Sequence, residues 1–319
     1  MSIRQKIIGS MLTLGFLIPL VSQAETERID WDVDDDGLIE INDLSDLNSI
    51  RNHLDGTGLH GEIRSCYGEV AASTACIGFE LTNNLDFDTN ADGLMNSNDI
   101  YWNDGLGWTP IADTVTAFTA IFNGNGNLIN NLYINQPSGP AIGAGLFLSL
   151  DGASVYNLGF SGALASINGF YYSGALSGIA MNSTVSAIDN TVNVSALLMA
   201  GGILGGGNLN TLKKLSNFGS VSAGYYVGGI VGYAEESSLE EGLSIGFVSN
   251  SEEASGGLIG YGSSITVLNS YWASDTTEQT ISAGSDDSFG VTIDELKCPV
   301  SSNNFSCSSV ELYTNWSVD

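Results

Sequence analysis

The sequence predicts an all-β fold, a parallel β-solenoid (β-helix) of about five to six coils. A glycine that opens a run of small apolar residues recurs along the chain, at Gly145, Gly174, Gly202, Gly229 and Gly257. Successive glycines lie 29, 28, 27 and 28 residues apart, a period that is typical of stacked repeats. The units hold short alternating apolar runs and no ten-residue stretch of helical period, which favours strands over helices.

One coil of this length has a contour of about 90 Å, enough for two or three short strands and their corners. Glycines suit the corners because they adopt positive φ without a Cβ clash. Asn157 and Asn269 each lie twelve residues past their glycine. They indicate either an asparagine ladder that stacks between coils or ordinary turn asparagines.

Residues 1–24 are typical of an export signal. Arg4 and Lys6 precede the apolar run Ile7–Val21, and Ser22-Gln-Ala24 offers a small-residue cleavage site. The apolar run is short for a bilayer span, although an uncleaved anchor is the alternative. We therefore expect an exported protein that is extracellular or on the outer cell surface, with the periplasm as a further location.

The charge of the chain is strongly lopsided. It has 8 basic residues against 36 acidic ones, and a formal net charge of −28. Nucleic acids and anionic membranes are recognised through basic patches, so both are excluded as partners. Cations are expected partners instead.

Four cysteines form two close sets, Cys66 with Cys76 and Cys298 with Cys307. Four cysteines permit three pairings, and proximity favours the two local ones. Export would place them in an oxidising compartment, where disulfides persist. Free thiols are the alternative, and would fit a cytoplasmic chain.

Residues 25–104 contain two twelve-residue acidic loops with the ligand spacing of an EF-hand-type calcium loop. The first supplies oxygens from Asp32, Asp34, Asp36, the carbonyl of Leu38, Glu40 and Asp43. The second supplies them from Asp88, Asn90, Asp92, the carbonyl of Leu94, Asn96 and Asp99. Each loop has glycine at its sixth position, where the bend is sharpest. Leu44, Leu47, Ile50 and Leu54 follow the first loop at helical spacing, which predicts a short amphipathic helix.

The second loop resembles dockerin-type calcium loops, which share its asparagine at position 9 and its aspartate at position 12. Both the spacing and the resemblance imply calcium as the cofactor. The alternative is a pair of metal-free turns, because Asp and Asn side chains also satisfy their own backbone. We expect no catalytic residues and no other cofactor site.

Residues 105–272 form the predicted solenoid domain. Residues 118–134 include Phe118, Phe122, Asn123-Gly-Asn-Gly126 and Tyr133, and predict a hairpin-like pair of strands in the first coil, with Phe122 and Tyr133 in the core. This phrase, followed by the Gly-Gly-x-x-Gly turns of the repeat, resembles the GLUG-repeat family. The resemblance implies a bacterial, exported, surface-associated or adhesin-like protein. GLUG repeats also occur beside immunoglobulin-A-cleaving metallopeptidase domains.

Residues 273–319 have no period. We expect this tail to cover the exposed edge of the last coil, with one helical turn between Thr292 and Lys297.

These observations favour a non-catalytic, calcium-binding extracellular module that is adhesin-like and binds an external ligand such as a glycan, a matrix component or a host surface. A polysaccharide-acting β-helix enzyme is the alternative, since such sites use clustered carboxylates with Arg or Lys. The basic residues between Gly145 and Trp272 are Lys213 and Lys214, which disfavours it. A third hypothesis treats the chain as a processed or truncated part of a longer adhesin or peptidase.

Overall fold

The computed structural model describes residues 28, 30–66, 74–138, 142–250, 252–284, 287–297, 312–313 and 315–316. Contacts divide the chain into two units, Met1–Asp30 and Trp31–Asp319, and the solenoid and both acidic loops belong to the second. The predicted export signal and the pair Cys298 and Cys307 lie outside the described residues. No helix among the described residues is long and apolar enough to cross a membrane.

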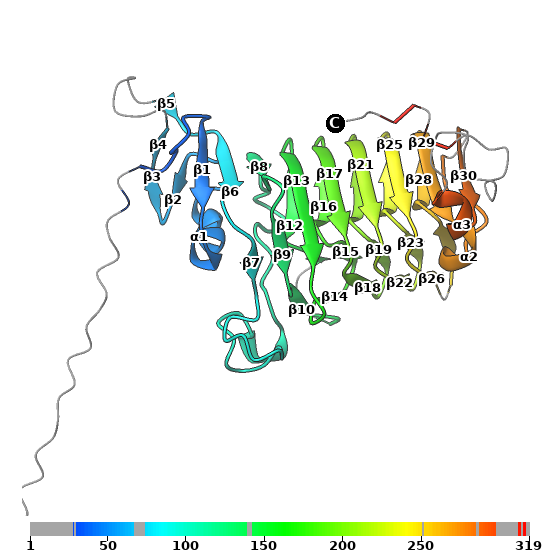
Figure 1. Ribbon diagram of the computed structural model, residues 1–319, viewed down its shortest axis with the longest axis horizontal. Helices are drawn as coiled ribbons and strands as arrows, with labels where there is room; N and C mark the ends of the chain where they lie inside the picture. The colour runs from blue at the N-terminus through cyan, green and yellow to red at the C-terminus, as the bar shows by residue number, and fades with distance from the viewer. Residues whose placement is uncertain are drawn as a thin grey trace, which may run out of the picture. The chain divides into compact units, whose positions relative to one another are not determined.

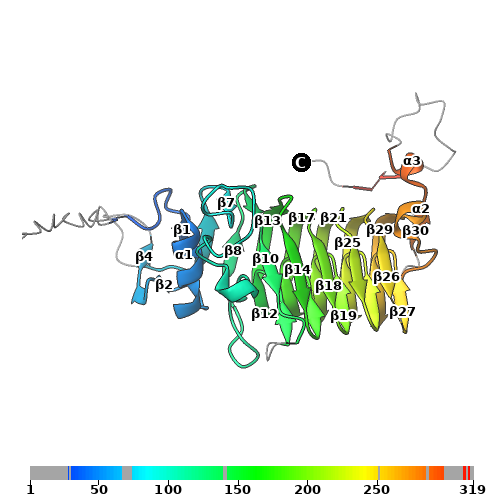
Figure 2. The same cartoon turned by 90° about the horizontal axis from the view of Figure 1, so that it is seen from below.

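The repeat is a parallel β-solenoid, which confirms the predicted fold class (Figure 1). Each coil has four short strands, more than the two or three expected, and each strand pairs in parallel with its equivalent in the next coil. The second sheet, visible in Figure 2, comprises β10 (Tyr133–Asn135), β14 (Ser166–Gly169), β18 (Asn193–Ala196), β22 (Val221–Ala223) and β26 (Val248–Asn250). The third comprises β11 (Gly143–Ala144), β15 (Tyr172–Ser173), β19 (Met199–Gly201), β23 (Tyr226–Gly228) and β27 (Ala254–Gly256). The fourth comprises β12 (Phe147–Asp151), β16 (Ser177–Met181), β20 (Leu204–Asn208), β24 (Val231–Glu235) and β28 (Ile259–Ser263).

The first sheet, here the long sheet, continues from the repeat into the N-terminal region. Its strands in spatial order are β1 (Leu38–Ile41), β6 (Gly78–Leu81), β8 (Ile121–Asn123), β13 (Ser154–Ser161), β17 (Thr184–Asn190), β21 (Thr211–Asn217), β25 (Ser238–Ser244), β29 (Thr266–Ala273) and β30 (Asp287–Val291). Beside this path, β7 (Leu85–Asp86) pairs with β9 (Leu128–Asn130), and β9 pairs with β13. Figure 1 shows β13, β17, β21, β25 and β29 side by side.

Short elements complete the N-terminal region. They are the predicted helix α1 (Leu44–Ser49) with its 3-10 extension Ile50–Asn52, the strand pairs β2 (Gly58–Leu59) with β3 (Glu62–Ile63) and β4 (Ser65–Cys66) with β5 (Thr74–Ala75), and a 3-10 turn at Asn103–Gly105. The expected disulfide between Cys66 and Cys76 is present. It closes the excursion between β3 and β6, where stacking supplies no neighbouring coil.

One apolar column runs through the long sheet from β1 to β29. In register, its members are Ile39, Phe79, Phe122, Val155, Val185, Leu212, Leu239 and Val267, and each is at most 2% exposed. Because parallel in-register strands put equivalent positions on one face, a single apolar position per coil builds a continuous core. The N-terminal region and the repeat therefore contribute to the same continuous apolar column.

The last glycine of the Gly-Gly-x-x-Gly phrase lets two backbones touch. A Cβ added at Gly232 would lie 2.5 Å from the carbonyl oxygen of Gly205 and 2.8 Å from the carbonyl carbon of Ala200. Gly205 and Gly260 are confined by backbone in the same way. At these glycines, the strand that a coil contributes to the fourth sheet packs directly against the strand that the preceding coil contributes to the third sheet. Only glycine permits so close a contact.

The two asparagines that could have formed a ladder lie at bends of the backbone instead. Asn157 and Asn269 have φ of 56° and 48°, and the equivalent positions Ala187, Lys214 and Glu241 also have positive φ. An amide ladder exists elsewhere, at Asn190 and Asn217, both fully buried. The Asn190 Nδ2 donates to Asn217 Oδ1 at 2.8 Å, and each side chain also exchanges hydrogen bonds with the backbone two residues on, at Val192 and Gly219.

The predicted hairpin around residues 123–126 is wrong. β8 and β9 do not pair with each other; both pair in parallel with β13, at Ser154–Tyr156 and Gly159–Ser161. The Gly124 and Gly126 amides donate to the carbonyls of Tyr156 and Asn157, so the turn follows the bend of the coil above it. Phe122 is in the core as expected, whereas Tyr133 is half-buried and stacks on Trp102.

The described part of the tail caps the last coil. β30 extends the long sheet, and the Ser282 Oγ accepts the amides of Leu258 and Ile259 at 3.3 and 2.9 Å. Gln279 Nε2 donates to the Val248 carbonyl at 2.8 Å. After α2 (Ser274–Thr277), the expected helical turn is α3 (Ile293–Leu296), which begins with a Thr292–Glu295 capping box. These contacts occupy edge groups that would otherwise recruit another strand.

Candidate metal centre

Asp32 begins the first acidic loop and holds it curled. Its carboxylate is fully buried and accepts the amide N–H of Asp36 at 2.9 Å and of Gly37 at 3.0 Å. Asp36 in turn accepts the Leu38 amide at 2.8 Å. The backbone turns through φ of 62° at Asp35 and 92° at Gly37, and glycine takes the second of these without strain.

Five carboxylates converge at this loop. Asp32, Asp34 and Asp36 each offer an oxygen within 4.8 Å of the others, and so do Asp34, Glu40 and Glu80. We call these five residues the first cluster. Its members belong to a loop and to two strands, so their convergence depends on the fold of the N-terminal region as well as on the loop.

The two glutamates of the first cluster come from adjacent strands. Glu40 of β1 and Glu80 of β6 are register partners, which puts both side chains on the same face of the long sheet. They are 4% and 5% exposed, so their carboxylates are largely removed from water. Asn123, the next residue of this column, reaches Glu80 Oε2 with its Nδ2 at 3.5 Å.

Burial and like charge both act on the first cluster. Burial and, after it, the charges of Asp36, Asp34, Glu40 and Asp32 together raise the pKa of Glu80 to about 7. Burial likewise raises the pKa of Asp36, with Asp34 and Asp32 adding to the effect. A carboxylate that resists ionisation for these reasons is stabilised in its charged form by a bound cation.

One predicted ligand of the first loop, Asp43, has another role. Asp43 is the N-cap of α1, where its side chain accepts the amides of Ser45 and Asp46 at 2.8 and 2.9 Å. Leu38 is the first residue of β1, in register with Gly78. Glu80, which the loop spacing does not include, lies beside Asp34 and Glu40 instead. The sequence signal for it was a glutamate inside the apolar run Ile77–Leu81, and the spacing of the loop did not contain it.

The second loop shares two positive-φ positions and three backbone-to-carboxylate hydrogen bonds with the first. Ala91 and Gly93 have φ of 55° and 78°, at the positions of Asp35 and Gly37. The Asp88 carboxylate accepts the amides of Asp92 at 3.2 Å and Gly93 at 3.0 Å, as Asp32 does for its own loop. Asp92 accepts the Leu94 amide at 2.9 Å, as Asp36 does for Leu38.

The second loop closes on its own last residue. Asp99 is 5% exposed and accepts the amides of Thr89 and Asn96, both at 2.8 Å. In the first loop, the amide at the same place as Thr89, that of Val33, donates to Glu40 instead. The side-chain carboxamides of Asn90 and Asn96 donate to Asp92 Oδ2 at 3.2 and 2.9 Å, which brings these three predicted ligands together.

The two loops therefore differ in charge and in setting. The first cluster has five carboxylates, which converge at one face of the long sheet, beside Glu40 of β1 and Glu80 of β6. The second loop has three carboxylates and two carboxamides, of which only Asp99 is buried. Carboxylate and amide oxygens are the ligands that hard divalent cations prefer, so the donor set of both loops fits calcium.

No protein-family model and no curated protein sequence matches the chain. Among solved structures, it is similar to a crystal structure described as "a putative immunoglobulin A1 protease from Bacteroides ovatus". The similarity covers 81% of this chain and 85% of that one, at 16% sequence identity and a TM-score of 0.44.

Proposed function

We propose that the chain is a non-catalytic, calcium-binding β-solenoid module that works outside the cell and contacts an external ligand. The observation that supports calcium most strongly is the agreement of the two loops. Separate stretches of sequence have positive φ at the same two positions and give position 1 the same two amide partners. Calcium, which takes six to eight oxygen ligands, fits such loops better than Mg²⁺ does. Mg²⁺ needs a smaller octahedral site and keeps several waters.

In this proposal, calcium stabilises the N-terminal end of the long sheet. Glu40 and Glu80 repel each other across the β1–β6 pair, and a cation between them would turn that repulsion into attraction. Calcium sites of extracellular modules have dissociation constants of about 10⁻⁴–10⁻³ M, so the sites would fill outside the cell and empty inside it. The net charge of −28 supports a role for calcium and disfavours nucleic acid and anionic membrane as partners.

The experiment is a thermal melt of the purified chain in calcium and in EDTA, with two single-charge variants. Calcium at 100 times its dissociation constant adds about 2.7 kcal/mol to the free energy of unfolding, so the wild type should melt higher in calcium. Asp34→Asn should lose the part of this gain that the first site contributes and keep the part from the second loop. Asp189→Asn, which removes one exposed carboxylate from β17, should keep it. Equal melting temperatures of the wild type in calcium and EDTA would reject the calcium proposal.

One observation favours a second candidate, a polysaccharide hydrolase. A glutamate with a pKa near 7 beside other carboxylates is the arrangement that glycosidases use for a general acid. Release of reducing ends from a polysaccharide panel, abolished by Glu80→Gln, would establish this activity. We expect no release by the wild type in either calcium or EDTA.

A further inference from the structure

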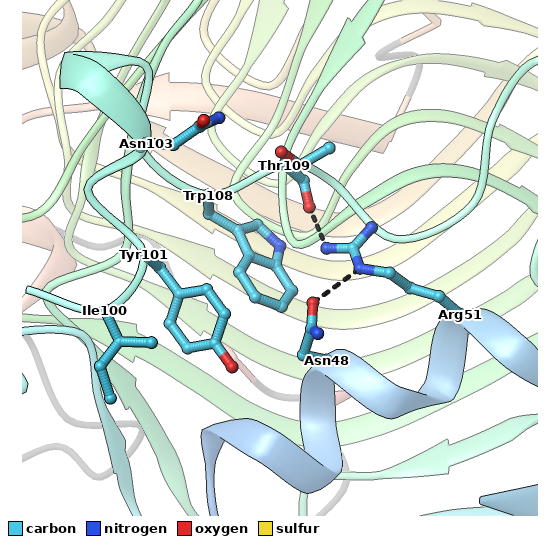
Figure 3. A pocket seen from close by; sticks show the side chains of 8 residues that line it. Asn48, Arg51, Ile100, Tyr101, Asn103, Trp108 and Thr109 are labelled. Atoms are coloured by element: carbon cyan, nitrogen blue, oxygen red, sulfur yellow. Dashed lines mark hydrogen bonds between the residues drawn. The ribbon is translucent and has the colours of Figure 1, made fainter. Parts of the chain in front are cut away.

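A polar cavity lies between α1 and the segment that follows the second loop (Figure 3). Its volume is about 440 Å³, within the range of small-molecule sites. Asn48 and Arg51 line it from the helix and its 3-10 extension, and Ile100, Tyr101, Asn103 and Thr109 line it from the other side. The cavity is separate from the first cluster.

Arg51 is anchored in this cavity by uncharged groups. Its Nε donates to Asn48 Oδ1 at 2.9 Å, its Nη1 to the Pro110 carbonyl at 2.7 Å, and its Nη2 to the Thr109 carbonyl. The guanidinium lies 4.6 Å from the ring centre of Trp108, which is fully buried. The described residues offer it no carboxylate within ion-pair distance, although the chain has 36 acidic residues.

Several hydrogen-bonding groups of the cavity have no partner among the described residues. A guanidinium has five N–H donors, so Arg51 keeps one on each terminal nitrogen. The Asn48 Nδ2, the Asn103 carboxamide and the Thr109 hydroxyl are also uncommitted to protein acceptors. Ile100, 75% exposed, and the half-buried Tyr101 ring add apolar surface beside them.

The rim of the cavity is held in a strained conformation. Asn103 and Asp104 have φ of 48° and 52°, and Gly105 and Gly107 have φ of 88° and 74°. Consecutive left-handed residues are costly outside glycine and are concentrated at binding sites. The Tyr101 ring packs edge-on against Trp108, with the ring centres 5.1 Å apart, which fixes the wall from which this turn leaves.

Charge selects the class of ligand. The Arg51 guanidinium, whose pKa burial lowers only to about 10, stays protonated at neutral pH and disfavours a cation. The net charge of −28 disfavours an anion. A neutral molecule with many hydroxyl groups and an apolar ring face would use the free donors, both carboxamides and the apolar wall together. We propose that this cavity binds one ring of a neutral sugar.

The second loop would control this site. The Ile100 amide donates to Thr89 Oγ1 at 3.0 Å and the Trp102 amide to the Asp99 carbonyl at 3.2 Å, so the cavity wall is tied to both ends of the loop. Filling the loop with calcium then orders the wall. This coupling to calcium rests on the proposed function; the sugar site itself does not.

The experiment is ligand-observed NMR on the full chain with three neutral probes, the methyl pyranosides of glucose, galactose and mannose, and two charged ones, methyl glucuronide and glucosamine. At least one neutral probe should give a saturable signal. It should weaken about tenfold, the loss of roughly one hydrogen bond, in Asn103→Gly and in Thr109→Val. Asn125→Gly and Thr116→Val are the matched controls and should bind as the wild type does. Asn125 is exposed and has a left-handed φ of 52°, close to the 48° of Asn103.

Three outcomes would overturn the sugar site: no saturable signal from any neutral probe, tighter binding of the glucuronide or glucosamine, or unchanged affinity in both cavity variants. EDTA and Asp92→Asn should weaken binding equally. If calcium raises the melting temperature but no neutral probe binds, the sugar site fails and the calcium module stands. If a probe binds and calcium changes no melting temperature, the sugar site stands and the calcium module fails.

Discussion

The N-terminal region and the repeat share the long sheet, but they differ in the polar side chains that they stack from coil to coil. The repeat stacks buried carboxamides, and the N-terminal region stacks buried carboxylates. In the repeat, the buried column is neutral, with Asn190 above Asn217. In the N-terminal region, another column of the long sheet brings Glu40 beside Glu80. Within the repeat that same column holds Lys213 beside Glu240, with Nζ and Oε2 3.1 Å apart. A parallel solenoid places each residue next to its counterpart one coil away. A carboxamide is both donor and acceptor, so it complements a copy of itself, whereas a carboxylate repels its copy. We therefore propose that the stacked acids of the N-terminal region are neutralised by a cation from solution.

The largest expected effect comes from converting one kind of column into the other. Asn217→Asp places a carboxylate in the fully buried ladder and removes the donor to the Gly219 carbonyl. An unpaired buried charge costs about 3–5 kcal/mol, so the free energy of unfolding in urea should fall by that amount at neutral pH. The loss should shrink in acid, where the new carboxyl is protonated.

Asn168→Asp is the matched control. Asn168 lies on the outer face of β14 and also bonds to its neighbour, Asn135, at 3.1 Å, but it is only half-buried. Its replacement should cost less than about 1 kcal/mol because water screens the new charge. Equal losses in the two variants would contradict the contrast drawn between the columns.

A smaller effect is expected from pH in the metal-free protein. The folded-state pKa of Glu80 is about 7, against an ordinary value of 4.5, so the folded chain binds more protons than the unfolded chain between these values. The contribution of Glu80 to stability is therefore complete below pH 4.5 and is lost as the pH rises through 7. In EDTA, urea unfolding should show stability falling across this window.

Glu80→Gln should flatten that pH dependence, and Glu253→Gln, an exposed matched control, should leave it as in the wild type. Saturating calcium should also flatten it, since the cation keeps the carboxylate ionised at lower pH. Stability that rises from pH 5 to pH 7 in the wild type but not in Glu80→Gln would contradict the assigned direction.

The smallest effect concerns strain in the repeat. Leu209 has φ of 58° at a corner where neighbouring coils have Gly152 and Asn182, and its side chain is 49% exposed. Leu209→Asn should raise the free energy of unfolding by about 0.5–1 kcal/mol, because asparagine tolerates the left-handed region better. Leu197→Asn, at an equally exposed leucine with no positive φ, should give no gain.

The periodic part of the fold was predictable because its information is local and repeated. Four of the five glycines that lead a unit have a backbone carbonyl of the next coil close by, as Gly145 has that of Gly174, and the fifth, Gly257, faces the Trp272 side chain. Two interpretations of Asn157 and Asn269 were open from the sequence, a stacked ladder or ordinary turn asparagines, and the structure shows the second. Asn157 and Asn269 share their place with Ala187 and Lys214, and what these positions have in common is a backbone bend.

The candidate site was predictable only within each loop. Spacing found Asp32, Asp34 and Asp36, but the carboxylate that completes the first cluster lies forty residues on, across a parallel strand pair. Asp43 fitted the spacing, yet a helix begins directly after it and uses it as the N-cap. In the second loop no such helix competes, and Asp99 stays in the loop.

Calcium titration calorimetry on the wild type, Glu80→Gln and Asp43→Asn tests the central claim most directly. We predict two sites in the wild type, loss or marked weakening of one in Glu80→Gln, and both sites retained in Asp43→Asn. Absence of calcium binding by the wild type, or loss of a site in Asp43→Asn but not in Glu80→Gln, would contradict the account.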